Sequence, residues 1–112
     1  MKLNTQALEN ASGVLITIED QNLDAGNSKV FKEEIQRHLD SNTLAILDLS
    51  ALKFVDSSGL GALLSCLRIM NNKESQLKLI GLTKPVRALF ELVRMHRIFS
   101  IYNSLEEAQA SI

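Results

Sequence analysis

Apolar and polar residues follow two different periods along the chain, which predicts a mixture of strands and helices. Five strands are expected, at residues 2–8, 14–18, 44–49, 77–80 and 98–102. The segment 44–49, Leu-Ala-Ile-Leu-Asp-Leu, is almost entirely apolar, as is typical of a strand buried on both faces. We therefore expect this strand in the interior of a sheet.

Three other segments carry apolar residues at helical spacing, and a fourth, at the end of the chain, begins with a capping signal. The helices are expected at residues 27–40, 58–72, 84–94 and 104–111. Asp24 or Asn27 is expected to cap the first helix, and Thr83 the third. Ser104 and Glu107 form an S-x-x-E capping box for the last. The apolar stripe of the third helix is expected to be Val86, Leu89, Phe90 and Val93.

The order of these elements, ββαβαβα(β)α, indicates an α/β protein. Strand–helix–strand units form right-handed crossovers between parallel strands. The expected architecture is one mixed sheet of four to five strands flanked by about four helices. A chain of 112 residues has room for one such domain, which we expect to span residues 1–112.

Composition narrows the class of protein further. The chain is 46% hydrophobic and 22% charged, which fits a globular domain and not a disordered one. A net charge of −1 gives no electrostatic footprint for nucleic acid or an anionic membrane. No apolar run is long enough to span a membrane, and the first residues do not resemble a signal peptide. These features predict a cytoplasmic protein.

The single cysteine and the two histidines suggest no further chemistry. Cys66 has no intramolecular partner for a disulfide, and its place in an apolar helix predicts a packed thiol. His38 and His96 lie far apart without metal-ligand spacing, and both are expected to be ordinary surface residues. We expect neither a metal nor a cofactor.

The informative segment is the run Asp56-Ser57-Ser58-Gly59-Leu60-Gly61, which lies where a helix is expected to begin. The first turn of a helix has unpaired N–H groups and a partial positive charge, so it stabilises anions, including a phosphate. The two glycines would let another protein approach closely, or would serve packing of the helix against the sheet. Asp and Ser are also ordinary capping residues. The pattern alone leaves both interpretations open.

This run, preceded by Asp48-Leu49-Ser50, resembles the signature of the STAS domain family, and more narrowly that of the anti-sigma factor antagonists of bacterial partner switching. The order of elements matches from about residue 5 to residue 110. Asn22-Leu23-Asp24 resembles the acidic loop before the family's first helix. By position, the resemblance makes Ser57 the phosphorylation site, with Ser58 as the alternative acceptor. It implies a partner-binding surface formed by Asp24, Asp56, Ser58, Gly59, Leu60 and Gly61.

The resemblance also implies a mechanism. The unphosphorylated protein binds a serine kinase of the GHKL type that is often itself the anti-sigma factor, phosphorylation of Ser57 releases it, and a PP2C-type phosphatase restores it. The segment Ala25-Gly26-Asn27-Ser28 departs from the family pattern, because it is more flexible than a plain helix start. This departure affects how the kinase docks.

Two other classes of function are weighed against this switch. A serine hydrolase is disfavoured because the sequence has no G-x-S-x-G elbow, and a nucleotide hydrolase because it has no P-loop. We therefore expect no enzyme and no catalytic residues. The stronger alternative is a constitutive STAS subunit of a transporter or a sensory assembly, which the Ser57-Ser58 pair argues against.

Overall fold

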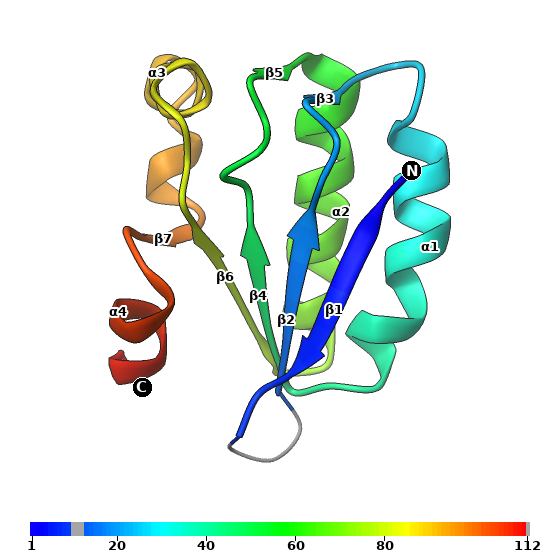
Figure 1. Ribbon diagram of the computed structural model, residues 1–112, viewed down its shortest axis with the longest axis vertical. Helices are drawn as coiled ribbons and strands as arrows, with labels where there is room; N and C mark the ends of the chain where they lie inside the picture. Colours follow the sequence, from blue (N-terminus) through cyan, green and yellow to red (C-terminus); the bar gives the residue numbers. More distant parts are fainter. Residues whose placement is uncertain (10–12, 112) are drawn as a thin grey trace.

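The computed structural model describes residues 1–9 and 13–111, and it contains a five-stranded mixed sheet (Figure 1). The strands lie in the order β1-β2-β4-β6-β7, with β1 antiparallel to β2 and the other neighbours parallel. Their bounds are β1 Leu3–Ala7, β2 Gly13–Ile18, β4 Leu44–Asp48, β6 Gln76–Ile80 and β7 Ser100–Tyr102. The predicted interior place of the strand at 44–49 is confirmed, since β4 is the central strand.

Four α-helices and one 3₁₀ helix accompany the sheet in the described residues. Their bounds are α1 Ser28–Asp40, α2 Ser57–Asn72, α3 Lys84–Leu92, η1 Met95–Arg97 and α4 Leu105–Ala110. These agree with the predicted helices to within two residues at every end. The helix α3 ends before the predicted residue 94 because Arg94 takes a left-handed backbone conformation, with φ 62°.

One detail predicted for α3 is wrong, and a second is confirmed only in position. Val93 was expected in the buried stripe, but it lies beyond the last helical residue and is 39% exposed. Thr83 occupies the N-cap position without a capping bond from its side chain. Its hydroxyl instead donates a hydrogen bond of 2.7 Å to the carbonyl of Leu52, which ties α3 to the loop after β4.

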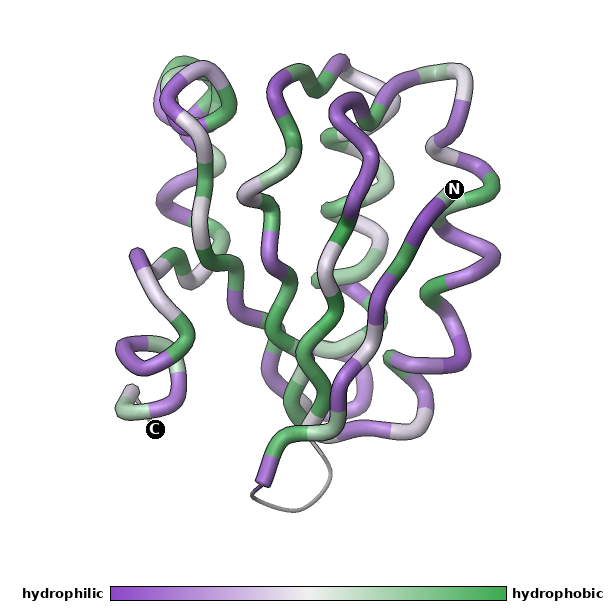
Figure 2. The backbone as a smooth tube through the Cα atoms, in the orientation of Figure 1, coloured by the Kyte–Doolittle hydropathy of each residue, from purple (hydrophilic) through white to green (hydrophobic). Residues whose placement is uncertain are grey.

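The two faces of the sheet are covered by different helices. Ala45 and Leu47 of β4 belong to the main core, to which α1 and α2 contribute Phe31, Ile35, Leu63 and Cys66 among others. Ile46 points the other way, as alternation along a strand requires, and packs with Ile80 and with Ala108 of α4. Figure 2 shows the hydrophobic residues concentrated in the middle strands, while the hydrophilic residues of α1 lie away from them.

A second, two-stranded sheet was not expected from the sequence. It pairs β3, Asn22–Leu23, with β5, Phe54–Val55, in parallel. Leu23 and Val55 are buried in this sheet, with 0% and 4% of their surface exposed. The small sheet lies beyond the carboxyl ends of β2 and β4 (Figure 1). It thereby holds the loop before α1 beside the start of α2.

Candidate functional site at the start of helix α2

The two serines are the first two residues of α2, and both are exposed. Asp56 precedes them in an extended conformation at the N-cap, and its Oδ1 accepts a hydrogen bond of 2.9 Å from the Gly59 N–H. Its backbone carbonyl accepts another from the Leu60 N–H, also of 2.9 Å. The capping interpretation is therefore correct for Asp56. The Gly59 N–H already has an acceptor, so it is not one of the free donors expected at a helix start.

The second carboxylate oxygen of Asp56 reaches a different part of the chain. Oδ2 accepts a hydrogen bond of 3.0 Å from the backbone N–H of Ala25, in the loop before α1. The bond from Gly59, foremost, and the bond from Ala25 hold the pKa of Asp56 below its usual value, although partial burial opposes them. Asp56 is therefore a carboxylate anion at neutral pH. One of its oxygens accepts a hydrogen bond from α2 and the other accepts one from the loop before α1.

Asn27 is the N-cap residue of α1, as one of the two predicted alternatives has it, but its side chain makes no capping bond and instead organises the loop together with Asp24. Asp24 Oδ1 accepts a hydrogen bond of 2.9 Å from the Gly26 N–H, and the Asp24 N–H donates one of 2.9 Å to Asn27 Oδ1. The Asp24 carbonyl accepts from the Ser28 N–H at 2.8 Å. These bonds give a defined shape to the segment 25–28, whose composition had suggested flexibility.

The two glycines of the motif differ in their surroundings. A Cβ at Gly59 would lie 2.1 Å from the Leu23 carbonyl oxygen and 2.9 Å from Val55 Cγ1, so α2 packs against the small sheet only because this residue has no side chain. A Cβ at Gly61 would meet nothing within 4 Å, and Gly61 is exposed. Packing therefore explains Gly59, whereas no internal contact explains Gly61.

Two further residues lie near the serines, namely Leu60 of the motif and Phe54 of β5. Leu60 is half-buried and packs against the main core. Phe54 is 52% exposed, three residues before Ser57, and it was not singled out from the sequence. The sequence carried no signal for it, because Phe54 adjoins the apolar Val55 and its exposure depends on how β5 packs. The structure thus brings an exposed aromatic ring, two exposed serines and the Asp24 loop to one end of the molecule.

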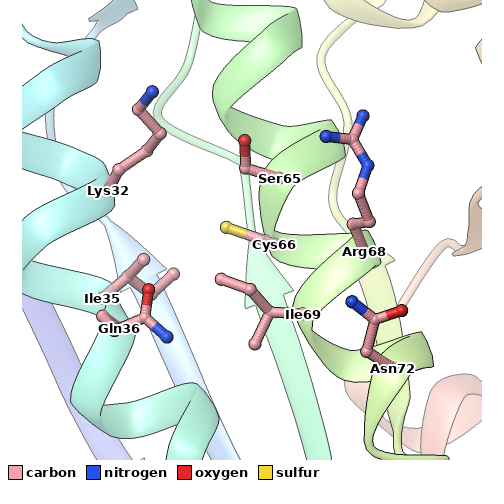
Figure 3. Close-up of a pocket in the computed structure, with 8 residues that line it drawn as sticks. All are labelled: Lys32, Ile35, Gln36, Ser65, Cys66, Arg68, Ile69 and Asn72. Carbon is pink, nitrogen blue, oxygen red and sulfur yellow. The ribbon is translucent and has the colours of Figure 1, made fainter.

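A groove of about 320 Å³ runs between α1 and α2, away from the serines (Figure 3). Its lining residues are Lys32, Ile35, Gln36, Ser65, Cys66, Arg68, Ile69 and Asn72. The Cys66 sulfur points toward α1, and the residue is 1% exposed. Burial raises the pKa of this thiol to about 12, so it is neutral and unreactive at physiological pH. The predicted packed thiol is confirmed.

Neither histidine lies in the motif: His38 is in α1 and His96 is in η1. Over residues 1–9 and 13–111, no group of three His, Cys, Asp or Glu residues is arranged to hold a metal ion. Over the same residues, no helix has the length and apolar content needed to cross a bilayer.

Comparisons with known proteins identify a family and relatives of this chain. Residues 4–108 match the family profile described as the STAS domain. The anti-sigma F factor antagonist of Paenibacillus polymyxa is 31% identical over 101 residues, which cover 87% of this chain and 85% of that protein.

Two solved structures share the fold. An anti-sigma factor antagonist from Mycobacterium paratuberculosis superposes with a TM-score of 0.82 at 20% identity, covering 99% of this chain and 94% of the other. The Bacillus cell fate determinant SpoIIAA, solved in its phosphorylated form, superposes with a TM-score of 0.70 at 20% identity and covers 97% of each chain.

Proposed function

Because the chain belongs to the STAS domain family, we propose that it acts in the cytoplasm as an anti-sigma factor antagonist controlled by phosphorylation of Ser57. The unphosphorylated form binds a serine kinase of the GHKL type that also serves as the anti-sigma factor. Phosphorylation releases this complex, and a PP2C-type phosphatase reverses the modification. The protein itself catalyses no reaction in this scheme.

The observation that carries the proposal is the position of Ser57. Its side chain is exposed at the first residue of α2, on the same end of the molecule as Phe54 and Asp24. A kinase reaches the hydroxyl without unfolding the chain, and the same surface is then available for stable binding. Ser58, Leu60 and Gly61 extend this surface along the first turns of α2, and Asp56 and Gly59 hold it in shape.

The chemical step takes place in the kinase. The Ser57 Oγ attacks the γ-phosphorus of ATP, a new O–P bond forms, and the bond from that phosphorus to the bridging oxygen breaks with its electrons on ADP. The hydroxyl proton passes to a base of the kinase. Inserting the resulting charge of about −1.5 to −2 into a packed interface opposes binding because the phosphate loses its water, and because its repulsion from the carboxylates of Asp24 and Asp56 is screened less once water is excluded.

The test is phosphorylation by purified GHKL-type kinases from the same organism, with ATP, followed by intact-mass spectrometry. One kinase should add a single phosphate to the wild-type protein and to Ser58→Ala, and none to Ser57→Ala. Full phosphorylation of Ser57→Ala would place the acceptor elsewhere.

Binding to that kinase provides the second measurement. Losing one partner of a buried charge pair costs about 2–5 kcal/mol, and an unpaired phosphate should cost at least as much. We therefore expect an affinity at least about thirtyfold lower for the phosphorylated form. Equal affinities would instead favour a constitutive STAS subunit of a transporter or sensory assembly.

A further inference from the structure

The carboxylate of Asp56 joins two segments that lie 34 residues apart in the sequence. Oδ1 accepts the Gly59 N–H of the first turn of α2, and Oδ2 accepts the Ala25 N–H of the loop before α1. The two distances are 2.9 Å and 3.0 Å, both typical of a well-formed hydrogen bond to an ionised group. One side chain therefore adds a direct link between the acidic loop and the phosphorylation site to the attachment that the small sheet already provides.

The other hydrogen bonds of residues 24–26 that join them to neighbouring segments stay within the loop or lead to α1, and Asn27 Nδ2 also donates to the Asn22 carbonyl of β3. Asp24 Oδ1 accepts from Gly26, and the Asp24 carbonyl accepts from Asn27 and Ser28. Among the hydrogen bonds of the described residues, the one from Ala25 to Asp56 is the link between residues 24–26 and α2. Breaking this bond releases Ala25 from Asp56 and leaves the internal turn intact. Leu23 stays in place, because it pairs with β5 and its carbonyl accepts the Asp56 N–H at 3.3 Å.

We propose that Asp56 is a positioning residue that transmits phosphorylation of Ser57 to residues 24–26. This inference rests on the proposed function only in taking Ser57 as the acceptor. A phosphate on Ser57 is a second anion on the residue next to Asp56. The two anions repel each other. They also compete for the backbone N–H groups of the same helical turn, where the Asp56 carboxylate already accepts a hydrogen bond from the Gly59 N–H.

The consequence is a rearrangement around Asp56. The phosphate competes for the N–H groups of the first turn, the Asp56 carboxylate turns away, and Ala25 loses its acceptor. Asp24 then loses the restraint that Ala25 provides and is held beside α2 only through Leu23 of the small sheet. The switch therefore has two outputs, since the modification adds charge at Ser57 and also displaces an acidic residue of the proposed docking surface.

The experiment uses the full chain with phosphoserine installed at position 57 during translation, so no kinase is needed. Amide hydrogen exchange is measured residue by residue by NMR. The Ala25 amide should exchange at least about tenfold faster than in the unmodified protein, because it has lost its acceptor. The Gly26 and Ser28 amides, whose acceptors belong to Asp24, should change less than about twofold.

A matched control places phosphoserine at Ser65, about two turns along α2 from Ser57. It adds the same charge to the same helix, and the Ala25 amide should be unaffected. Unchanged exchange at Ala25 in the phosphoserine-57 protein would overturn the proposal. Equal acceleration by the two modifications would overturn it as well, because the effect would then be one of net charge.

The variant Asp56→Ser separates the link from the cap. Serine is a good N-cap residue whose single oxygen can accept from Gly59, but it cannot also hold Ala25. In this variant the Ala25 amide should exchange fast without phosphate, and phosphoserine at 57 should accelerate it less than about twofold further. A further tenfold acceleration would show that Asp56 is not the relay. Failure of any kinase to modify Ser57 would contradict the proposed function and leave these measurements standing.

Discussion

At the scale of single residues, Gly59 and Gly61 offer the sharpest contrast in the structure. The two are separated by one residue in α2, yet one is buried against backbone and the other faces open space. In Gly59→Ala the new methyl would have to displace the Leu23 carbonyl, so we expect a loss of unfolding free energy of at least about 2 kcal/mol. Urea denaturation followed by circular dichroism measures it.

Gly61→Ala is the matched control, because the chemical change and the helix are the same. Alanine favours a helix over glycine by about 0.5–1 kcal/mol, and no neighbour obstructs it. This variant should therefore be slightly more stable than the wild type. A substantial loss of stability in Gly61→Ala would mean that the open space beside Gly61 is occupied by part of the chain.

The buried thiol gives a second prediction at this scale. Burial raises the Cys66 pKa to about 12, well above the ordinary value of about 8.5. The folded state therefore holds the thiol proton more tightly than the unfolded state, and this contribution to stability is complete below about pH 8.5. It is lost as pH rises from there toward 12. The advantage of the wild type over Cys66→Ala in urea should shrink between pH 8 and pH 10, and an advantage independent of pH would contradict the burial of the thiol.

At the scale of elements, α4 is attached to the sheet by an unusual residue. Lys78 lies in β6 and is 5% exposed. Its Nζ donates to the carbonyl of Ala108 at 2.6 Å and to that of Ser111, and it lies 5.4 Å from the centre of the Tyr102 ring. A cation is favourable at a helix C-terminus, where carbonyls lack partners. Lys78 thus holds the C-terminal end of α4 against the sheet, where Ala108 of α4 packs on Ile46 and Ile80.

Replacing Lys78 by methionine tests this attachment, because methionine keeps the apolar stem and removes the donor. We expect a stability lower by about 1–3 kcal/mol, as for the loss of hydrogen bonds to a charged group. Amide exchange in residues 105–110 should accelerate more than in α1. The matched control is Lys84→Met at an exposed position of α3, which should stay within about 0.5 kcal/mol of the wild type. Equal effects of the two variants would mean that Lys78 does not hold α4.

The elements also show what the sequence predicts and what it cannot. The five strands of the main sheet and the four α-helices were all predicted, whereas the three-residue 3₁₀ helix η1 was not. The strands β3 and β5 have two residues each, too few for any period. Their pairing depends on Leu23 and Val55 meeting across the fold, which is a tertiary effect. The bond between Ala25 and Asp56 follows from that pairing and was equally inaccessible.

At the scale of the whole molecule, the parallel order of β2, β4 and β6 places the start of α2 and the loop before α1 at the same end of the sheet (Figure 1). Crossover connections dictate this, because each returns the chain to the same starting edge. The resemblance had predicted that the motif and the acidic loop belong to one surface. The topology supplies the physical reason. The exposed ring of Phe54 could not be foreseen, since its exposure depends on how β5 packs.

The same topology leads to a prediction for the folded state as a whole. Ser57 is exposed, and the core beneath it is held by Leu63, Cys66 and other buried residues that phosphate does not touch. Densely packed interiors resist small displacements, so the strain of a new surface charge should relax locally. We expect phosphoserine at position 57 to shift NMR amide signals around residues 24–26 and 54–62, and to leave those of β2 and β6 in place. Ser57→Asp should fold in the same way and reproduce the loss of kinase binding only in part, because it carries one negative charge instead of nearly two. Shifts spread through residues 14–18 and 77–80 would mean that the signal travels by rearranging the sheet, and a switch confined to the surface would then be wrong.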